Sequence, residues 1–132
     1  MPSVDLQIPA RAPFVGVVRL ALASLARGAG LDEEKVDDLK IAVSEACATA
    51  VLLAEGSDPA PPIDVRWNDD GDRLTVEITD SAPRSDETAD AGDSLSLSSR
   101  AVMSEALLRT LVHDYESTQT PEGTVTRLRI DR

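Results

Sequence analysis

The sequence has few aromatic residues, one cysteine and one histidine, and it has no long hydrophobic run. Only three of its 132 residues are aromatic, so a core must be built from Leu, Val, Ile and Ala. The single cysteine, Cys47, cannot form an internal disulfide, which is typical of a reducing compartment. Because no segment has the length of a membrane span and the N-terminus has no signal-peptide pattern, we expect a cytoplasmic protein without membrane contact.

Basic residues are also scarce. The 24 acidic and 13 basic side chains give a formal net charge of −11. Nucleic-acid binding needs a basic surface to neutralise phosphates, so this composition argues against direct nucleic-acid contact and suits a protein partner with basic patches. The one histidine, His113, has no Cys or His cluster around it, so the sequence predicts no metal site.

Hydrophobic periodicity predicts five strands and three helices in one domain over residues 1–132. The predicted strands are 4–8, 63–67, 74–78, 113–118 and 125–130, and the predicted helices are 14–27, 33–54 and 99–112. Residues 80–99 are rich in Asp, Ser, Thr and Ala and predict a long, flexible, lid-like loop. This order predicts an α+β fold, a two-layer sandwich of a mostly antiparallel mixed β-sheet with helices packed on one face.

Glu45 is a carboxylate inside the otherwise apolar helical segment 41–51. Burying a charge is costly unless it is paired or acts on a ligand, so Glu45 is a candidate general base. Alternatively, Glu45 is a remnant without a catalytic role that makes a hydrogen bond or faces a partner. Thr49 lies one turn later on the same helix face. The Thr49 hydroxyl either binds a magnesium ion or donates a hydrogen bond to the carbonyl oxygen four residues back. A threonine side chain favours the hydrogen bond.

The run Glu45-Ala46-Cys47-Ala48-Thr49-Ala50 resembles the first nucleotide-site motif of the GHKL ATPase superfamily. It is closest to the form used by bacterial serine-kinase anti-sigma factors, roughly Glu-Ala-x-x-Asn-Ala. In those proteins the Glu polarises the hydroxyl of a serine on a partner protein, and the Asn ligates magnesium. The resemblance extends to the order of helices and strands and so covers nearly the whole chain. Thr49 departs from it, because it stands at the Asn position.

Asp80 matches the family Asp that contacts the adenine amino group, and the pair Gly123-Thr124 matches a later family position. In the family this Asp opens an Asp-x-Gly-x-Gly turn, but Ala82 and Arg84 stand at the two glycine positions here. Glycine lets a backbone approach a ligand closely and adopt positive φ, and neither Ala nor Arg does this freely. An ordinary Asp at a strand end is the alternative interpretation of Asp80.

The family's phosphate-binding glycines fall at the start of the third predicted helix, where this chain has Val102 and Ser104. Val102 crowds the backbone N–H groups that would hold a phosphate, and Glu105 repels it. The resemblance and its departures together imply a degenerate nucleotide site, with no cofactor or only weakly bound Mg-ATP.

Arg19 lies in the first predicted helix at the family's spacing from Glu45, where an Arg contacts the sigma factor and its antagonist. Arg11 and Arg27 are further candidates for partner contact, and a solvated helix side chain is the alternative for each. The resemblance implies an anti-sigma factor that sequesters an alternative sigma factor, is countered by a STAS-type anti-anti-sigma partner, and forms a homodimer. Two alternatives stay open: an active ATP-dependent protein-serine kinase that phosphorylates the antagonist, and a module that binds the antagonist alone.

Overall fold

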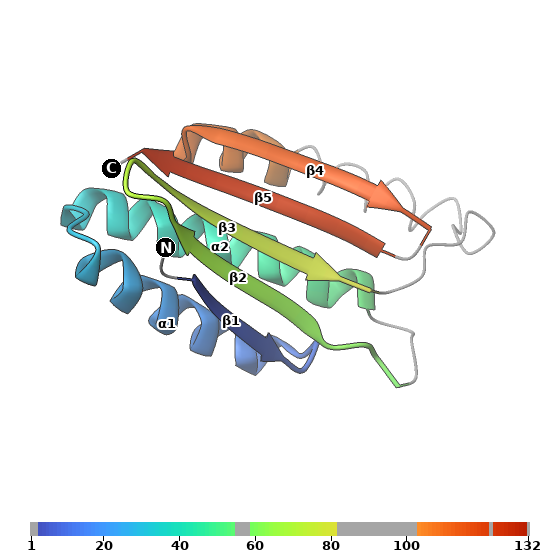
Figure 1. The fold of residues 1–132 in the computed structure, drawn as a ribbon. Helices are drawn as coiled ribbons and strands as arrows, with labels where there is room; N and C mark the ends of the chain where they lie inside the picture. Colours follow the sequence, from blue (N-terminus) through green and yellow to red (C-terminus); the bar gives the residue numbers. More distant parts are fainter. Residues whose placement is uncertain (1–2, 55–58, 82–102, 122, 132) are drawn as a thin grey trace.

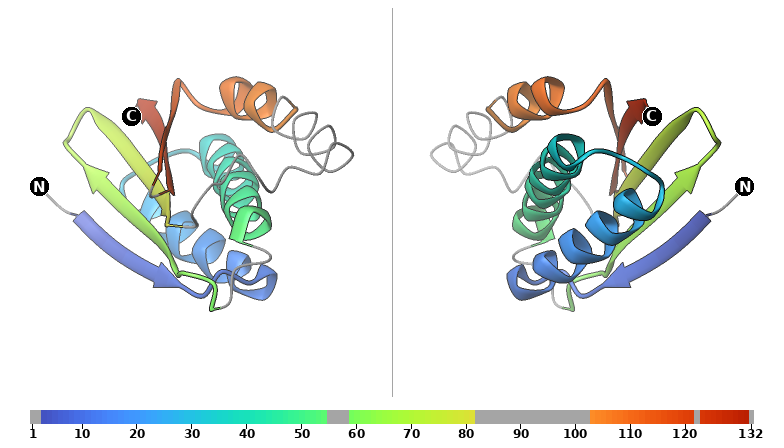
Figure 2. Two further views of the ribbon diagram at one scale, coloured as in Figure 1. Left: turned by 90° about the vertical axis from the view of Figure 1, so that its right-hand side faces the viewer. Right: turned by 90° about the vertical axis from the view of Figure 1, so that its left-hand side faces the viewer.

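A five-stranded antiparallel sheet carries the helices on one face (Figures 1 and 2). The computed structural model describes residues 3–54, 59–81, 103–121 and 123–131. In chain order the elements are β1 (Ser3–Ile8), the 3-10 turn η1 (Ala12–Phe14), α1 (Val15–Gly28), α2 (Glu33–Ala54), β2 (Ile63–Asp69), β3 (Arg73–Asp80), β4 (Asp114–Thr120) and β5 (Gly123–Asp131). Residues 103–111 form a further helix between β3 and β4.

The strand order is β1-β2-β3-β5-β4, and each neighbouring pair is antiparallel. The predicted two-layer α+β fold is therefore confirmed, and the described sheet contains no parallel pair. Strand and helix limits differ from the predictions by a few residues at most. One shift matters: Asp80, predicted as the first residue of the long loop, is the last residue of β3. The rest of that loop, from 82 to 99, lies outside the described residues.

The core lies between the sheet and α1 and α2, and it is aliphatic as predicted. Its largest fully buried side chains include Leu39, Ile63, Leu74, Ile78 and Leu128. Burial of these apolar groups supplies the main favourable free energy of the fold. Among the described helices, none combines the length and the hydropathy needed to cross a bilayer.

The helix α2 begins as its sequence predicts. The backbone N–H of Lys35 donates to Asp32 Oδ1 at 2.9 Å, so Asp32 caps the helix N-terminus. Glu33 and Glu34 in the first turn complement the positive end of the helix dipole. One side of α2 then packs on the sheet and another side packs on α1. The side chains of α2 that face neither of them lie at the surface.

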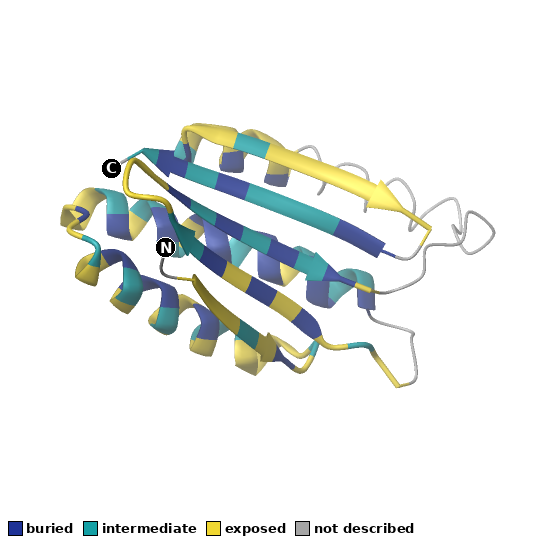
Figure 3. Ribbon diagram, in the orientation of Figure 1, coloured by how far each residue is buried: buried dark blue, intermediate teal, exposed yellow. Residues whose placement is uncertain are grey.

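The sheet face opposite the helices is polar, with exposed and intermediate residues alternating with buried ones along β2 and β3 (Figure 3). One row crosses all five strands with alternating charge: Asp5, Arg66, Glu77, Arg127 and Glu116. Arg66 lies 2.8 Å from Asp5, and Arg127 lies 2.6 Å from Glu77 and 3.4 Å from Glu116. Opposite charges directly across neighbouring strands stabilise that register over a shifted one.

Candidate functional site

Asp80 and Thr124 lie opposite each other where β3 ends and β5 begins. Along β3 the residues Leu74, Val76, Ile78 and Asp80 are buried in turn, so Asp80 continues the row that faces the helices. Asp80 is 5% exposed and Thr124 is 7% exposed. A carboxylate and a hydroxyl together in apolar surroundings have the chemistry to recognise an amino-bearing base, which is the role that the resemblance implies for this end of the site.

Position 123, at the start of β5, has room only for glycine. Its φ is +151°, and a Cβ built on it would lie 2.0 Å from the backbone oxygen of Asp80. No side chain fits there, because the backbone of β5 begins directly against the end of β3. The close approach of these two strand ends is what sets Thr124 beside Asp80.

Ser104 is the third buried polar residue in the described chain, and it is 6% exposed. It shares the buried face of the helix at 103–111 with Leu108, one turn later. Asp80, Ser104 and Thr124 make up all the buried polar and charged residues of the described chain, and each occupies a position that the sequence matched to a nucleotide-site motif. Ala82 and Val102 lie outside the described residues.

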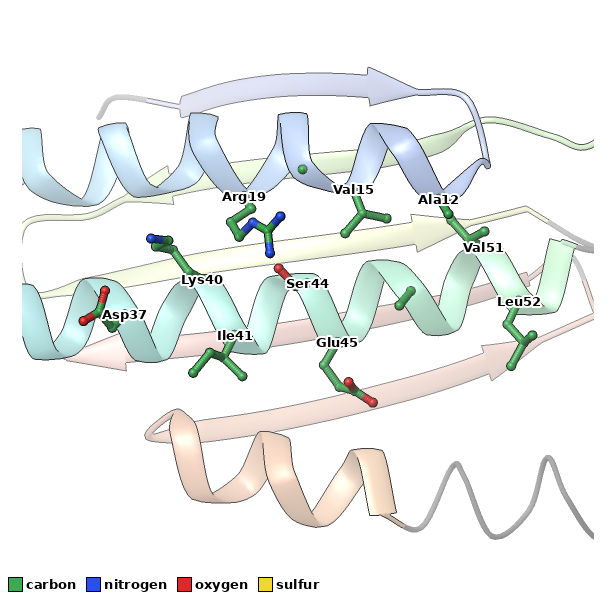
Figure 4. Close-up of a pocket in the computed structure, with 12 residues that line it drawn as sticks. Ala12, Val15, Arg19, Asp37, Lys40, Ile41, Ser44, Glu45, Val51 and Leu52 are labelled. Carbon is green, nitrogen blue, oxygen red and sulfur yellow. The ribbon is translucent and has the colours of Figure 1, made fainter.

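Glu45 and Thr49 share one face of α2, as their spacing predicts, and both are half-buried. The Thr49 hydroxyl donates to the backbone oxygen of Glu45 at 3.0 Å, so the side chain is turned back along its own helix. This is the second of the two roles that the sequence left open for Thr49. The Glu45 carboxylate points toward the helix at 103–111 (Figure 4). A carboxylate is therefore present for a magnesium ion, but at the position of the family's Asn amide the chain has only a short hydroxyl that its hydrogen bond holds along α2.

A groove of about 860 Å³ runs between α1 and α2 on the side away from the sheet. Arg19 from α1 and Lys40 and Ser44 from α2 line its polar part, and Val15, Ile41 and Leu52 line its apolar part (Figure 4). Glu45 borders the same groove, but in Figure 4 its carboxylate points away from Arg19. Successive residues of α2 thus serve two surfaces, with Ser44 on the α1 side and Glu45 on the opposite side.

The other two candidate partner-contact residues, unlike Arg19, are not among the side chains that line this groove. Arg27 forms a two-point ion pair with Glu33, with Nε and Nη2 donating at 2.9 and 3.3 Å. The hydrogen bond and the opposite charge raise the pKa of Arg27 and lower the pKa of Glu33. Arg11 is exposed before the turn η1, and its backbone N–H donates to the oxygen of Pro9. Arg27 is thus engaged within the chain.

Sequence reasoning did not single out Ser44 or Lys40. A serine one position before the candidate base, in an apolar helix, was the available signal, but its significance depends on which helix face meets α1.

Cys47 is buried, and this burial raises the pKa of its thiol to about 12, in agreement with its predicted role as a core residue.

Comparison with known proteins identifies the family of this chain. The family model described as "Histidine kinase-like ATPase domain" matches residues 8–130. The chain belongs to the histidine kinase-like ATPase domain family. This confirms the GHKL resemblance, and it covers every described candidate residue of the nucleotide site.

Curated relatives include the serine-protein kinase RsbW of Bacillus subtilis, which is 38% identical over 77 residues covering 58% of this chain and 48% of that protein. RsbW of Listeria innocua is also 38% identical over 77 residues, covering 58% of this chain and 49% of that protein. The chain matches about half the length of these relatives. A crystal structure of the RsbU and RsbW domains of a Mycobacterium tuberculosis protein aligns with a TM-score of 0.75 at 19% identity, over 100% of this chain and 33% of that one. It shows the shared fold.

Proposed function

We propose that this chain is an anti-sigma regulator of a partner-switching system. It binds and sequesters an alternative sigma factor, a STAS-type anti-anti-sigma protein competes for it, and the active unit is a homodimer. Family membership and similarity to the serine-protein kinases named RsbW support this role. The accessible groove beside Arg19 supports a protein partner, because an arginine at a groove suits carboxylate recognition at interfaces.

We further propose that the nucleotide site is degenerate and that binding, and not phosphate transfer, carries the function. One observation supports this more than any other: Thr49 donates its hydroxyl to the Glu45 backbone oxygen in place of offering an amide oxygen toward a metal. Phosphate transfer needs a magnesium ion to spread the developing charge, and the Thr49 hydroxyl is shorter than an Asn amide and a weaker ligand for that ion.

The active protein-serine kinase is the second candidate. The buried pair Asp80 and Thr124 favours it, because Asp80 stands where the family Asp contacts adenine and is 5% exposed on the helix-facing side of the sheet. Similarity to relatives that are serine-protein kinases also favours it. Glu45 remains the candidate base in this reading.

Calorimetric titration with Mg-ATP separates the two candidates, using the wild-type chain and Thr49→Asn. A degenerate site predicts no detectable heat for the wild type up to millimolar nucleotide. Thr49→Asn restores the missing oxygen ligand and should then bring Mg-dependent binding into the measurable range, at least tenfold tighter. Micromolar binding by the wild type, with phosphate transfer to an anti-anti-sigma protein that Glu45→Gln abolishes, would establish the kinase instead. Co-purification with a sigma factor tests the sequestering role separately.

A further inference from the structure

The hydroxyl of Ser44 is buried without a hydrogen-bond partner, and within the described residues it is the one buried side-chain polar atom in that state. Other hydroxyls on described helices behave differently. Thr49 donates to the Glu45 backbone oxygen at 3.0 Å, and Thr110 donates to the Ala106 backbone oxygen at 2.9 Å. A buried polar atom without a partner destabilises the state that contains it. Such an atom therefore suggests a second state in which the partner is present.

Arg19 is the candidate for that partner on the facing helix α1. Both side chains line the groove between α1 and α2, and in Figure 4 the Arg19 guanidinium points toward the Ser44 hydroxyl. A Cβ on Gly16 would lie 3.5 Å from Arg19 Nη2, so the Arg19 side chain lies over Gly16 of the same helix. Lys40, one turn before Ser44, adds a second cation to the same part of the groove.

Arg19, like Arg11, differs from the other arginines in the part of the chain that the structure describes. Six described arginines each form an ion pair with a carboxylate: Arg27, Arg66, Arg73, Arg109, Arg127 and Arg129. Within the same described residues Arg19 has no ion pair or hydrogen bond through its side chain. Residues 6–31 contain no Asp or Glu, although the chain carries a net charge of −11. The α1 side of the groove thus has no acidic group. Of the acids on its α2 side, Glu45 points away from Arg19 and Asp37 lies beyond Lys40 (Figure 4), so an incoming molecule can supply the carboxylate that the guanidinium pairs with.

We propose that Ser44 is a positioning residue for Arg19 and makes the groove selective for a side-chain carboxylate of a protein partner. When the carboxylate enters, Arg19 pairs with it and donates a further N–H to Ser44 Oγ, while Lys40 faces the same carboxylate. Guanidinium has five N–H donors in a rigid fork, so it serves both acceptors at once. The Ser44 hydroxyl is then satisfied only in the bound state, and this difference favours binding.

The groove also limits the shape of the occupant. From Asp37 to Leu52 its α2 side is about 22 Å long, enough for a four-turn helix laid along it. Val15 and Leu52 give it an apolar lining on the side of Arg19 away from Lys40, Ile41 adds an apolar group on the side of α2 opposite α1, and Asp37 at the end beyond Lys40 repels a second acid (Figure 4). The fitting occupant is an amphipathic helix whose apolar face carries one acidic residue. This assignment rests on the proposed partner-binding function and names the chemistry of the partner.

The test uses the full chain and a synthetic 14-residue helical peptide with capped ends, a Leu and Ala face, and one central Glu. A matched peptide has Gln at that position. We expect the wild-type chain to bind the Glu peptide about tenfold more tightly than the Gln peptide, as for one charge-assisted pair in a partly desolvated site. Arg19→Gln should remove the preference, and Ser44→Ala should reduce it to about two- to threefold. Ser24→Ala, at an exposed position of α1, is the matched control and should keep the full preference.

A second readout separates positioning from simple packing. Ser44→Ala removes an unsatisfied buried hydroxyl, so its unfolding midpoint should be equal to or above that of the wild type while its carboxylate preference falls. A lowered midpoint together with the lost preference would make Ser44 a structural residue and overturn the proposal. An undiminished preference in Ser44→Ala, or no binding of the Glu peptide at millimolar concentration, would also overturn it. Because no sigma factor enters this assay, failure of the sequestering function is detected independently.

Discussion

Replacing Gly123 with alanine tests whether the strand ends that carry Asp80 and Thr124 really meet as closely as the structure shows. The added Cβ would lie 2.0 Å from the Asp80 backbone oxygen and 2.9 Å from both the Asp80 carbonyl carbon and Ser81 Cα. An ordinary C···O contact is about 3.3 Å or longer. The backbones of β3 and β5 must therefore separate by about 1 Å at this point.

Two costs add in Gly123→Ala. A φ of +151° is rarely adopted by residues with a side chain, which costs about 1–3 kcal/mol. Forcing extra volume against a backbone costs about 1–3 kcal/mol more. We expect a loss of about 3 kcal/mol in the free energy of unfolding. The displaced end of β3 should also separate Asp80 from Thr124, so any nucleotide binding should weaken with it.

Two other glycines are matched controls. Gly71 has a φ of +99°, but a Cβ there would meet nothing within 4 Å, so Gly71→Ala has only the backbone cost of about 1–2 kcal/mol. At Gly28, the last residue of α1, a Cβ would also meet nothing within 4 Å and no positive φ occurs. Gly28→Ala should be neutral or up to about 1 kcal/mol more stable than the wild type.

Urea unfolding followed by tryptophan fluorescence measures all three variants, because the chain has one tryptophan and Trp67 is 3% exposed. The reasoning predicts the order Gly28→Ala, Gly71→Ala, Gly123→Ala from most to least stable. A Gly123→Ala variant as stable as Gly71→Ala would show that the two strand ends have room for a methyl group. That result would refute the close approach on which the Asp80 and Thr124 site depends.

Three further outcomes can be measured on the same protein. Burial raises the pKa of the Cys47 thiol to about 12 from an ordinary 9.0, so iodoacetamide at pH 8 should modify it only after unfolding, as mass spectrometry would report. Because the folded-state pKa is the higher one, the stability that the neutral thiol contributes is complete below about pH 9 and is lost as the pH rises above that value. Arg127→Met should cost about 0.5–1 kcal/mol in urea unfolding, less in 1 M salt, because it leaves the half-buried Glu77 carboxylate without its 2.6 Å partner. Arg66→Met, at an ion pair whose side chains are 62% and 70% exposed, should change stability little, and equal losses in the two variants would contradict this ranking.

Much of the fold was predictable because its signals are local. The helix α2 was expected at 33–54 and begins and ends there, since Asp32 provides its cap and its apolar residues recur at helical spacing. The strands were found within a few residues by their alternation. The end of β3 was missed, because Asp80 looks like a turn residue in isolation and becomes a strand residue only through pairing with Ile63 and Thr124.

The sequence predicted the candidate site less completely than it predicted the fold. Family motifs identified Glu45, Thr49, Asp80, Ser104 and Thr124, and the structure places the last three as buried polar residues. Nothing local marked Ser44, because a serine in a helix can bond the carbonyl one turn back or point to solvent. Its lack of a partner depends on how closely α1 covers it.

The sequence by itself determined the secondary structure, the order of its elements, the excess of acidic charge and the membership of the family, because each follows from residue types at short spacing. Only the tertiary structure decided which residues meet. Strand register places Thr124 opposite Asp80 and aligns five charges across the sheet, and helix packing points Arg19 toward Ser44 while Glu45 faces the other way. These contacts join residues far apart in the chain, and their geometry follows from the shape of the whole core, which no short stretch of sequence contains.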